Sequence, residues 1–297
     1  MQLLFSPRSQ GDRERTSAPS AGILSGVTEL PGRADGVRSD ALRADEAAAA
    51  LAMSMWPRFA GRASGGWSRH EPGVSAYCSG APVWIFNGVI AASVRADPAL
   101  VAELLDAVAG AVPEYCLQVR PGAHGVEEVA RARGMVVGEQ EPLMLLEDRD
   151  RLASAASVDG LVIRRLRADE VDRHLAVVAE GFGAPVELFA AWDASDLLGS
   201  NDVYAYAGSV AGRDVATALG IVADDHVGVF NVAVAPGHRR RGYGAALSSR
   251  TVLDGLATGA RRALLMSSEM ALSVYQQLGF REIERWSYWV PPDAPEA

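Results

Sequence analysis

Lysine is absent from this chain of 297 residues, and cysteine is scarce. All 28 cationic side chains are arginines, which together with the alanine-rich composition indicates a GC-rich coding bias. The two cysteines, Cys78 and Cys116, fall on separate predicted strands in a chain without an evident export signal, so we expect free, buried thiols. The five histidines are scattered without the paired spacing of metal ligands, and no metal site is expected.

The chain also lacks an apolar run long enough to cross a membrane. The two most apolar stretches, 47–56 and 99–112, fall short of the roughly 18 residues that a span needs. The first residues contain no extended apolar region, so we expect no secretory signal and a cytoplasmic location. The formal net charge of -9 argues against nonspecific nucleic-acid binding, and neither nucleic acid nor membrane is expected as a partner.

What the sequence does contain is an apolar strand that runs into a basic, glycine-containing turn. The β-branched residues of 229–234 predict the strand, and Pro236 ends it. Gly242 and Gly244 lack the Cβ atoms that would keep a ligand away from the backbone. Apolar residues at helical spacing after them predict a helix that starts near Gly242 and points unpaired N–H groups at an anion. This order of elements predicts a pyrophosphate site.

The turn resembles the acyl-CoA motif of the GCN5-related N-acetyltransferase (GNAT) family, which reads Arg/Gln-x-x-Gly-x-Gly/Ala. Arg239, Gly242 and Gly244 occupy its fixed positions. The resemblance implies that acetyl-CoA is bound here as the acyl donor and that no metal is needed. The residues assigned to donor binding on this ground are Val232, Ala233, Val234, Arg239, Arg240, Arg241, Gly242, Tyr243, Gly244 and Ala245.

A second motif follows downstream. Residues 262–268 predict a short buried strand, and 269–278 predict a helix with Glu269 in its first turn. Pattern alone would make Tyr275 a core residue, but Tyr275-Gln-Gln-Leu-Gly-Phe280 resembles the family's Tyr-x-x-x-Gly-Phe ending. That resemblance implies a catalytic Tyr275 whose hydroxyl protonates the CoA thiolate. Ser268, where the family often has asparagine, is expected to cap the helix or contact the donor.

The predicted elements of the second half follow the order expected of a GNAT domain. Strands at 161–167, 203–210 and 215–222, with a helix from 168 to about 180, precede the strand at 229. The expected fold class is α/β (α+β), with a mixed, mostly antiparallel sheet flanked by helices. In the last strand, 284–290, the aromatic side chains either line an acceptor pocket or pack against the sheet, and the pattern does not decide between these; they are Trp286, Tyr288 and Trp289.

The first half repeats the second in outline. Phe86 matches Phe230 at an offset of 144 residues, and Gly134 falls on Gly279 at an offset of 145. The first copy has Ala91-Ala-Ser-Val-Arg-Ala-Asp-Pro98 in place of the arginine-glycine turn and Ala130 in place of Tyr275. We therefore expect a disordered extension over 1–40, a catalytically silent GNAT-like domain over 41–150 and a complete catalytic GNAT domain over 158–297. This arrangement resembles that of tandem GNAT proteins.

The implied reaction is acetylation of a primary amine by direct attack, without an acyl-enzyme. The general base is left open between Glu180, Asp225, His226, Glu269 and a water. The acceptor is left open among small amines, aminoglycosides, amino acids, peptides and protein amines. Formation of a homodimer is left open as well. Two alternatives are a CoA-binding regulatory or interaction module without turnover and a transferase for another acyl group, such as propionyl or succinyl.

Overall fold

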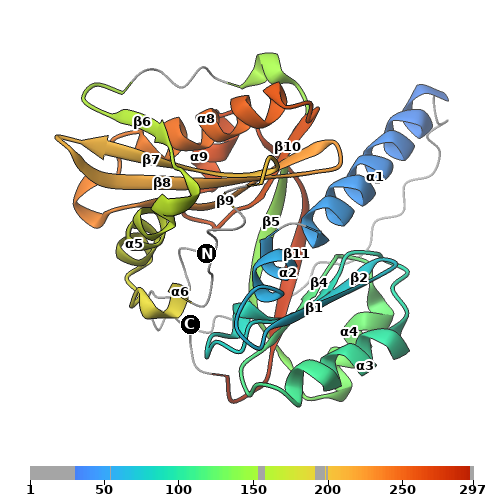
Figure 1. Cartoon of the computed structure of the whole chain (residues 1–297). Coiled ribbons are helices and arrows are strands. Elements are labelled where there is room, and N and C mark those ends of the chain that lie inside the picture. The colour runs from blue at the N-terminus through green and yellow to red at the C-terminus, as the bar shows by residue number, and fades with distance from the viewer. Residues whose placement is uncertain (1–30, 54, 153–157, 191–197, 199, 295–297) are drawn as a thin grey trace, which may run out of the picture.

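The structure, a computed structural model, describes residues 31–53, 55–152, 158–190, 198 and 200–294. Its central feature is a single sheet of eleven strands in the order β1-β2-β3-β4-β11-β5-β10-β9-β8-β7-β6. Helices pack on both faces of this sheet (Figure 1). No helix in these ranges is both long and apolar enough to cross a membrane.

The amino-terminal half, residues 31–152, contributes five strands. They are β1 (Trp67–Glu71), β2 (Val74–Cys78), β3 (Asn87–Ala91), β4 (Cys116–Val119) and β5 (Val136–Leu146). Its helices are α1 (Pro31–Ala52), α2 (Met55–Ala60), α3 (Pro98–Ala109) and α4 (His124–Ala132), with the 3-10 turns η1 (Trp84–Phe86) and η2 (Arg149–Arg151). Cys78 on β2 and Cys116 on β4 are buried free thiols, as predicted.

The carboxyl-terminal half, residues 158–294, contributes six strands. They are β6 (Val162–Arg165), β7 (Val203–Val210), β8 (Arg213–Ala223), β9 (His226–Val234), β10 (Arg262–Met266) and β11 (Arg281–Val290). Its helices are α5 (Val171–Phe182), α6 (Glu187–Ala190), α8 (Tyr243–Ala257) and α9 (Leu272–Gln277), with the 3-10 turns η3 (Ala168–Glu170) and η4 (Pro236–His238). α5 and α8 both pack on β8 and β9, and Figure 1 shows them on opposite faces of the sheet.

The two halves exchange their last strands. β5 comes from the amino-terminal half but lies between β10 and β11, antiparallel to both. In return, β11 from the carboxyl-terminal half pairs with β4 of the amino-terminal half. Figure 1 shows β5 and β11 running side by side between the other strands of the two halves.

This exchange corrects the expectation of two separate domains. The mixed, mostly antiparallel sheet flanked by helices is confirmed, but it is one continuous sheet. The carboxyl-terminal half is also not complete by itself, because β10 takes its antiparallel neighbour from the other half. The predicted extension over 1–40 is wrong for its last ten residues, since α1 begins at Pro31; residues 1–30 lie outside the described part of the chain.

A buried ion-pair network closes the junction between the halves. Arg120, which follows β4 and has a side chain only 5% exposed, donates from Nε and Nη2 to both carboxylate oxygens of Glu284 on β11, at 2.7 to 2.9 Å. Its Nη1 also pairs with Asp45 of α1. The indole N–H of Trp286, which is fully buried, donates to Glu284 at 3.0 Å. Three segments far apart in sequence are thereby fixed to one another.

The network predicts a strong effect on stability. Arg120→Met leaves the Glu284 carboxylate buried without its guanidinium partner, which should lower the free energy of unfolding by about 3 to 5 kcal/mol in urea titrations. The double variant Arg120→Met/Glu284→Met removes both charges and should recover part of that loss. A single-variant loss below about 1 kcal/mol, the range of an exposed pair, would show that the network does not hold the halves together.

Candidate active site

The turn between β9 and α8 has the conformation that an anion site requires. β9 ends before Pro236, and α8 begins at Tyr243, close to the predicted start. Gly242 caps this helix at a φ of 80°, a left-handed conformation that glycine adopts without strain. The Ala246 N–H bonds to the Gly242 carbonyl, so the N–H groups of the three preceding residues point out of the positive helix end.

The two glycines of this turn are explained by different constraints. Gly242 is required by its positive φ. Gly244 has no such φ, and a Cβ built there would lie 3.7 Å from Val234 Cγ2 and 3.8 Å from Val232 Cγ1, which are ordinary contacts. Packing therefore does not explain a glycine at 244. Close approach of a ligand to the backbone does explain it.

The three arginines of the turn are exposed but do not act alike. Arg239 donates to the carbonyl of Val234 at 3.3 Å and to that of Gly181 in α5 at 2.6 Å, so it ties the turn to α5. Arg241 donates to the Gly237 carbonyl at 3.3 Å and braces the turn itself. Arg240 takes a positive φ of 58°. Part of this basic run thus shapes the turn, and binding of a ligand by these side chains stays a prediction.

β9 and β10 separate along their length and leave an opening in the sheet. They pair in parallel only from His226 to Gly228, although β9 continues to Val234. Beyond that point β10 pairs with β5 on its other side, while β9 bends. The bend is a bulge: Asn231 has a φ of 49°, and Asn231 and Val232 together face a single residue of β8. The backbone of β9 at Val232, Ala233 and Val234 is therefore not paired with β10.

The equivalent region of the amino-terminal half is closed. There β3 and β4 stay paired from Gly88 to Ala91, along the whole of β4. The helix after β3 is capped by Asp97, whose carboxylate accepts from Ala99 N–H at 3.0 Å and would repel an anion. Ala130, fully buried, occupies the place of Tyr275. These observations favour the prediction that this half is catalytically silent.

Tyr275 and Ser268 lie in one cavity, but the helix that carries Tyr275 is shorter than predicted. α9 begins at Leu272, after a turn, so Ser268 is not its N-cap, and Glu269 does not lie in its first turn. The cause is local: Ser268 to Ala271 close a turn through the Ala271 N–H at 3.0 Å. Tyr275 is 8% exposed, and burial raises its pKa to about 12.

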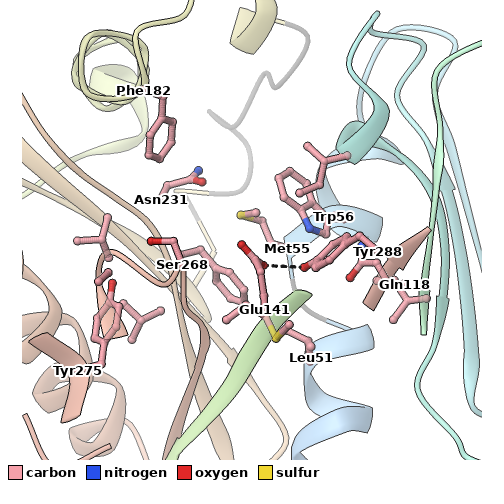
Figure 2. A pocket seen from close by; sticks show the side chains of 17 residues that line it. Leu51, Met55, Trp56, Gln118, Glu141, Phe182, Asn231, Ser268, Tyr275 and Tyr288 are labelled. Carbon is pink, nitrogen blue, oxygen red and sulfur yellow. Dashed lines mark hydrogen bonds between the residues drawn. The ribbon is translucent and has the colours of Figure 1, made fainter. Parts of the chain in front are cut away.

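The cavity lies between the two halves (Figure 2). From the carboxyl-terminal half it is lined by side chains of α5, β9, β10, α9 and β11 and of the turn after β10, among them Val232, Ser268 and Tyr275. The amino-terminal half supplies Leu51, Met55, Trp56, Ile85, Ile90, Gln118 and Glu141. Of the three aromatic residues left undecided in the last strand, Tyr288 lines the cavity, whereas Trp286 and Trp289 are buried in separate hydrophobic cores.

None of the four predicted base candidates lines this cavity. Glu180 pairs with Arg213, and both are exposed. Glu269 is also exposed and pairs with Arg285, and the half-buried Asp225 pairs with Arg261. His226 is buried at the other end of β9, where desolvation lowers its pKa.

Sequence reasoning missed Glu141 and Asn231. Glu141 is 5% exposed and accepts a hydrogen bond from the Tyr288 hydroxyl at 2.9 Å, drawn in Figure 2. Asn231 is also 5% exposed, lines the cavity, and has no hydrogen-bond partner for either amide atom in the described structure. The repeat contained a signal for Asn231, since it aligns with Asn87. Glu141 gave no signal, because its position in the cavity depends on the strand exchange.

Comparison with known proteins agrees with this geometry. The family model for the acetyltransferase (GNAT) domain matches residues 200–282. A GCN5-related N-acetyltransferase from Kribbella flavida is 22% identical, with a TM-score of 0.63 over 84% of this chain and 95% of that one. One from Sphaerobacter thermophilus is 15% identical, with a TM-score of 0.54 over 76% and 78% of the two chains.

A tandem GNAT protein from the clavulanic acid biosynthesis pathway is 14% identical, with a TM-score of 0.52 over 73% of this chain and 77% of that one. A search of curated proteins found no match. At these identities the structural likenesses establish the GNAT fold, and their coverage extends this likeness over both halves of the chain.

The turn yields a prediction about donor binding. Gly244→Trp should raise the Kd for acetyl-CoA by at least about 10²-fold, because the indole would occupy the place of a pyrophosphate that contacts the helix N-terminus. Isothermal titration calorimetry measures this Kd. Gly237→Ala, in the same turn with open space around its Cβ, is the matched control and should bind normally. Unchanged affinity in a folded Gly244→Trp protein would exclude the turn as the donor site.

Proposed function

We propose that the protein transfers an acetyl group from acetyl-CoA to a primary amine, because residues 200–282 match the family model for the acetyltransferase (GNAT) domain and the chain has the GNAT fold. One observation carries the proposal. Among the described residues, the strand opening, the glycine turn and a buried tyrosine at the family's position occur together only in the carboxyl-terminal half. Val232 beside the turn and Tyr275 line the same cavity.

The residues at the opening suit a long donor that is anionic at one end. The unpaired N–H groups at the start of α8 bind the pyrophosphate, and glycine at 244 lets it approach. The unpaired edge of β9 at Val232 and Val234 bonds to the amides of the pantetheine arm. A backbone N–H of the same edge faces the thioester oxygen, and one such preorganised donor contributes about 3 to 4 kcal/mol in acyl-transfer enzymes.

Tyr275 serves as the hydrogen-bond donor to the departing sulfur. Its pKa of about 12 keeps the phenol protonated at neutral pH, as a proton donor must be. A thiol has an ordinary pKa of about 8.5, so complete transfer of the proton to the thiolate is uphill. Tyr275 therefore stabilises the thiolate chiefly through its hydrogen bond and completes the transfer as the amine loses its own proton.

Transfer occurs by direct attack of the amine, because no suitable sulfur nucleophile lies at the cavity. Neither Cys78 nor Cys116 lines it. Burial raises the pKa of Cys116 to about 12, which leaves almost no thiolate at neutral pH. The two thiols belong to the interior of the amino-terminal half.

The proposal is tested by release of free CoA thiol from acetyl-CoA with a panel of amines. The panel contains small amines, aminoglycosides, amino acids, and peptides with lysine side chains, and the expected result is turnover with at least one class. Propionyl-CoA and succinyl-CoA are run in parallel to test the acyl group. Tight acetyl-CoA binding without thiol release for any amine would instead identify a CoA-binding module.

Tyr275→Phe should lower kcat by about 10²-fold, because the departing thiolate loses its hydrogen-bond donor. The Kd for acetyl-CoA should change little, since phenylalanine fills the same space. Tyr115→Phe, on a half-buried residue outside the cavity, controls for loss of a phenol elsewhere. A kcat equal to that of the wild type would reduce Tyr275 to a packing residue.

A further inference from the structure

The amide of Asn231 on β9 is a buried polar group without a partner. The residue is 5% exposed, and in the described structure neither Oδ1 nor Nδ2 of its side chain has a hydrogen-bond partner. Among the described residues that line the cavity between the halves, Asn231 is the one with buried side-chain polar atoms left unpaired. A buried amide without hydrogen bonds is unfavourable, so a ligand that supplies these bonds gains affinity.

The backbone conformation at this bulge does not account for an asparagine. Asn231 has a φ of 49°, which asparagine tolerates, but glycine adopts such a φ without strain and has no amide to bury. Asn87, which aligns with Asn231 in the repeat, has an extended φ of -141° and an amide that is fully bonded to neighbouring residues. The amide of Asn87 thus serves the fold, whereas that of Asn231 is open to a ligand.

The Asn231 amide and Tyr275 lie on opposite sides of β9. Ala233 packs in one core with Phe182 of α5, whereas Val232 packs against another core, which contains Tyr275. Figure 2 shows the Asn231 side chain pointing into the cavity on the side of Phe182, away from Tyr275. A donor in the opening between β9 and β10 would have Tyr275 on one side and Asn231 on the other. The space for an attacking nitrogen is therefore on the Asn231 side.

Most side chains that line the cavity on this side are apolar. Met55 and Ile85 of the amino-terminal half line it and pack in the same core as Phe182, and Phe230 of β9 packs against that core. Apolar walls beside one uncharged, unpaired amide favour a molecule with an apolar body and a polar head that forms hydrogen bonds.

We propose that Asn231 binds the acceptor: its carboxamide oxygen accepts a hydrogen bond from the nitrogen of a primary amine that has an apolar body and lies on the α5 side of β9. This inference rests on the proposed acetyl transfer. An amine nitrogen carries N–H donors whether it is charged or neutral, so the same bond holds it before and after it loses a proton. Val232, the next residue, begins the edge at which the donor is proposed to bind, so the nitrogen is held beside the acyl group.

Asn231 positions the nitrogen but takes no proton from it. An amine with a pKa of about 10.4 must lose one proton before it attacks, and this proton passes to water. The neutral nitrogen then forms the C–N bond while the C–S bond breaks. The second proton lost by nitrogen balances the proton that Tyr275 gives to sulfur, so the products are an N-acetylamine, CoA thiol and one proton.

The test compares two cations that differ in their N–H groups. Calorimetry is carried out, with and without saturating CoA, on 2-phenylethylamine and on trimethyl(2-phenylethyl)ammonium, which has the same charge but no N–H. Asn231→Gly should raise the Kd of the amine about tenfold, because one hydrogen bond is lost, and should change that of the quaternary ion less than about twofold. Measuring both ligands on both proteins separates the hydrogen bond from the difference in ligand size. The Kd for acetyl-CoA should not change.

Two further variants and a stability measurement separate binding from folding. Asn231→Asp keeps an oxygen at the same place and should retain binding of the amine. Ala211→Gly replaces another residue at positive φ, 48°, in the exposed turn between β7 and β8, and should change neither Kd. Asn231→Gly should unfold at a urea concentration no lower than the wild type does, because it removes a buried, unpaired amide. A lower urea midpoint with an unchanged Kd for the amine would make Asn231 a structural residue.

The remaining outcomes distinguish the two proposals. Failure of the wild type to bind 2-phenylethylamine, or an equal loss of both cations in Asn231→Gly, would overturn the acceptor site. A raised Kd for acetyl-CoA alone would assign the amide to the donor instead. Thiol release from acetyl-CoA with an amine whose KM is the same in Asn231→Gly would also overturn the site, while upholding acetyl transfer. Conversely, amine binding that depends on Asn231, without thiol release for any amine, would uphold the site and overturn the proposed reaction.

Discussion

The pairing of β5 with both β10 and β11 is the constraint on which the rest of this structure depends. β5 completes the sheet of the carboxyl-terminal half, and β11 does the same for the amino-terminal half. Neither half could satisfy the hydrogen bonds of its own sheet edge without the other. The cavity beside β10 consequently has walls from both halves, and Glu141 on β5 is part of it.

This pairing explains why the sheet depends on the amino-terminal half, although that half, in its described residues, has neither a strand opening nor a glycine turn. In the amino-terminal half the strand opening is closed by pairing, and the helix cap is an acidic side chain. Its last strand cannot be dispensed with, because it supplies the neighbour of β10. A side chain on that strand then lies in the cavity beside β10, and Glu141 occupies that position.

The parts of the structure that the sequence predicted correctly are those set by local interactions. The turn from Pro236 to Gly244 depends on proline, on glycine at positive φ and on the helix that follows, all within a short stretch. The strands of the carboxyl-terminal half were predicted to within a few residues for the same reason. α9 was predicted too long, because a hydrogen-bonded turn replaces its first helical turn.

What the sequence could not provide is the partner of each strand. The neighbours of β5, Val136–Leu146, are chosen by contacts between residues more than 100 positions apart. An offset of 145 places Glu141 on Trp286, and in the structure these two residues face each other across β5 and β11. Two strands that align as repeats also pair as neighbours, which periodicity cannot reveal. The four residues predicted as base candidates all belong to the carboxyl-terminal half, and none of them lines the cavity.

Asn87 and Asn231 occupy equivalent positions in the two halves, one where the neighbouring strands stay paired and one where they separate. Asn87 has an extended φ of -141°, and its amide bonds to Ser79, Gly80, Ala81, Val83 and Glu114, so every polar atom is satisfied. Asn231 has a φ of 49°, forms the bulge that turns β9 away from β10, and keeps both amide atoms unpaired. A buried, unpaired amide group costs about 1 to 3 kcal/mol, and a strained φ adds to that. The unpaired amide and the bulge at Asn231 are accounted for if the bulge serves to open the sheet for a ligand whose polar groups restore the missing hydrogen bonds.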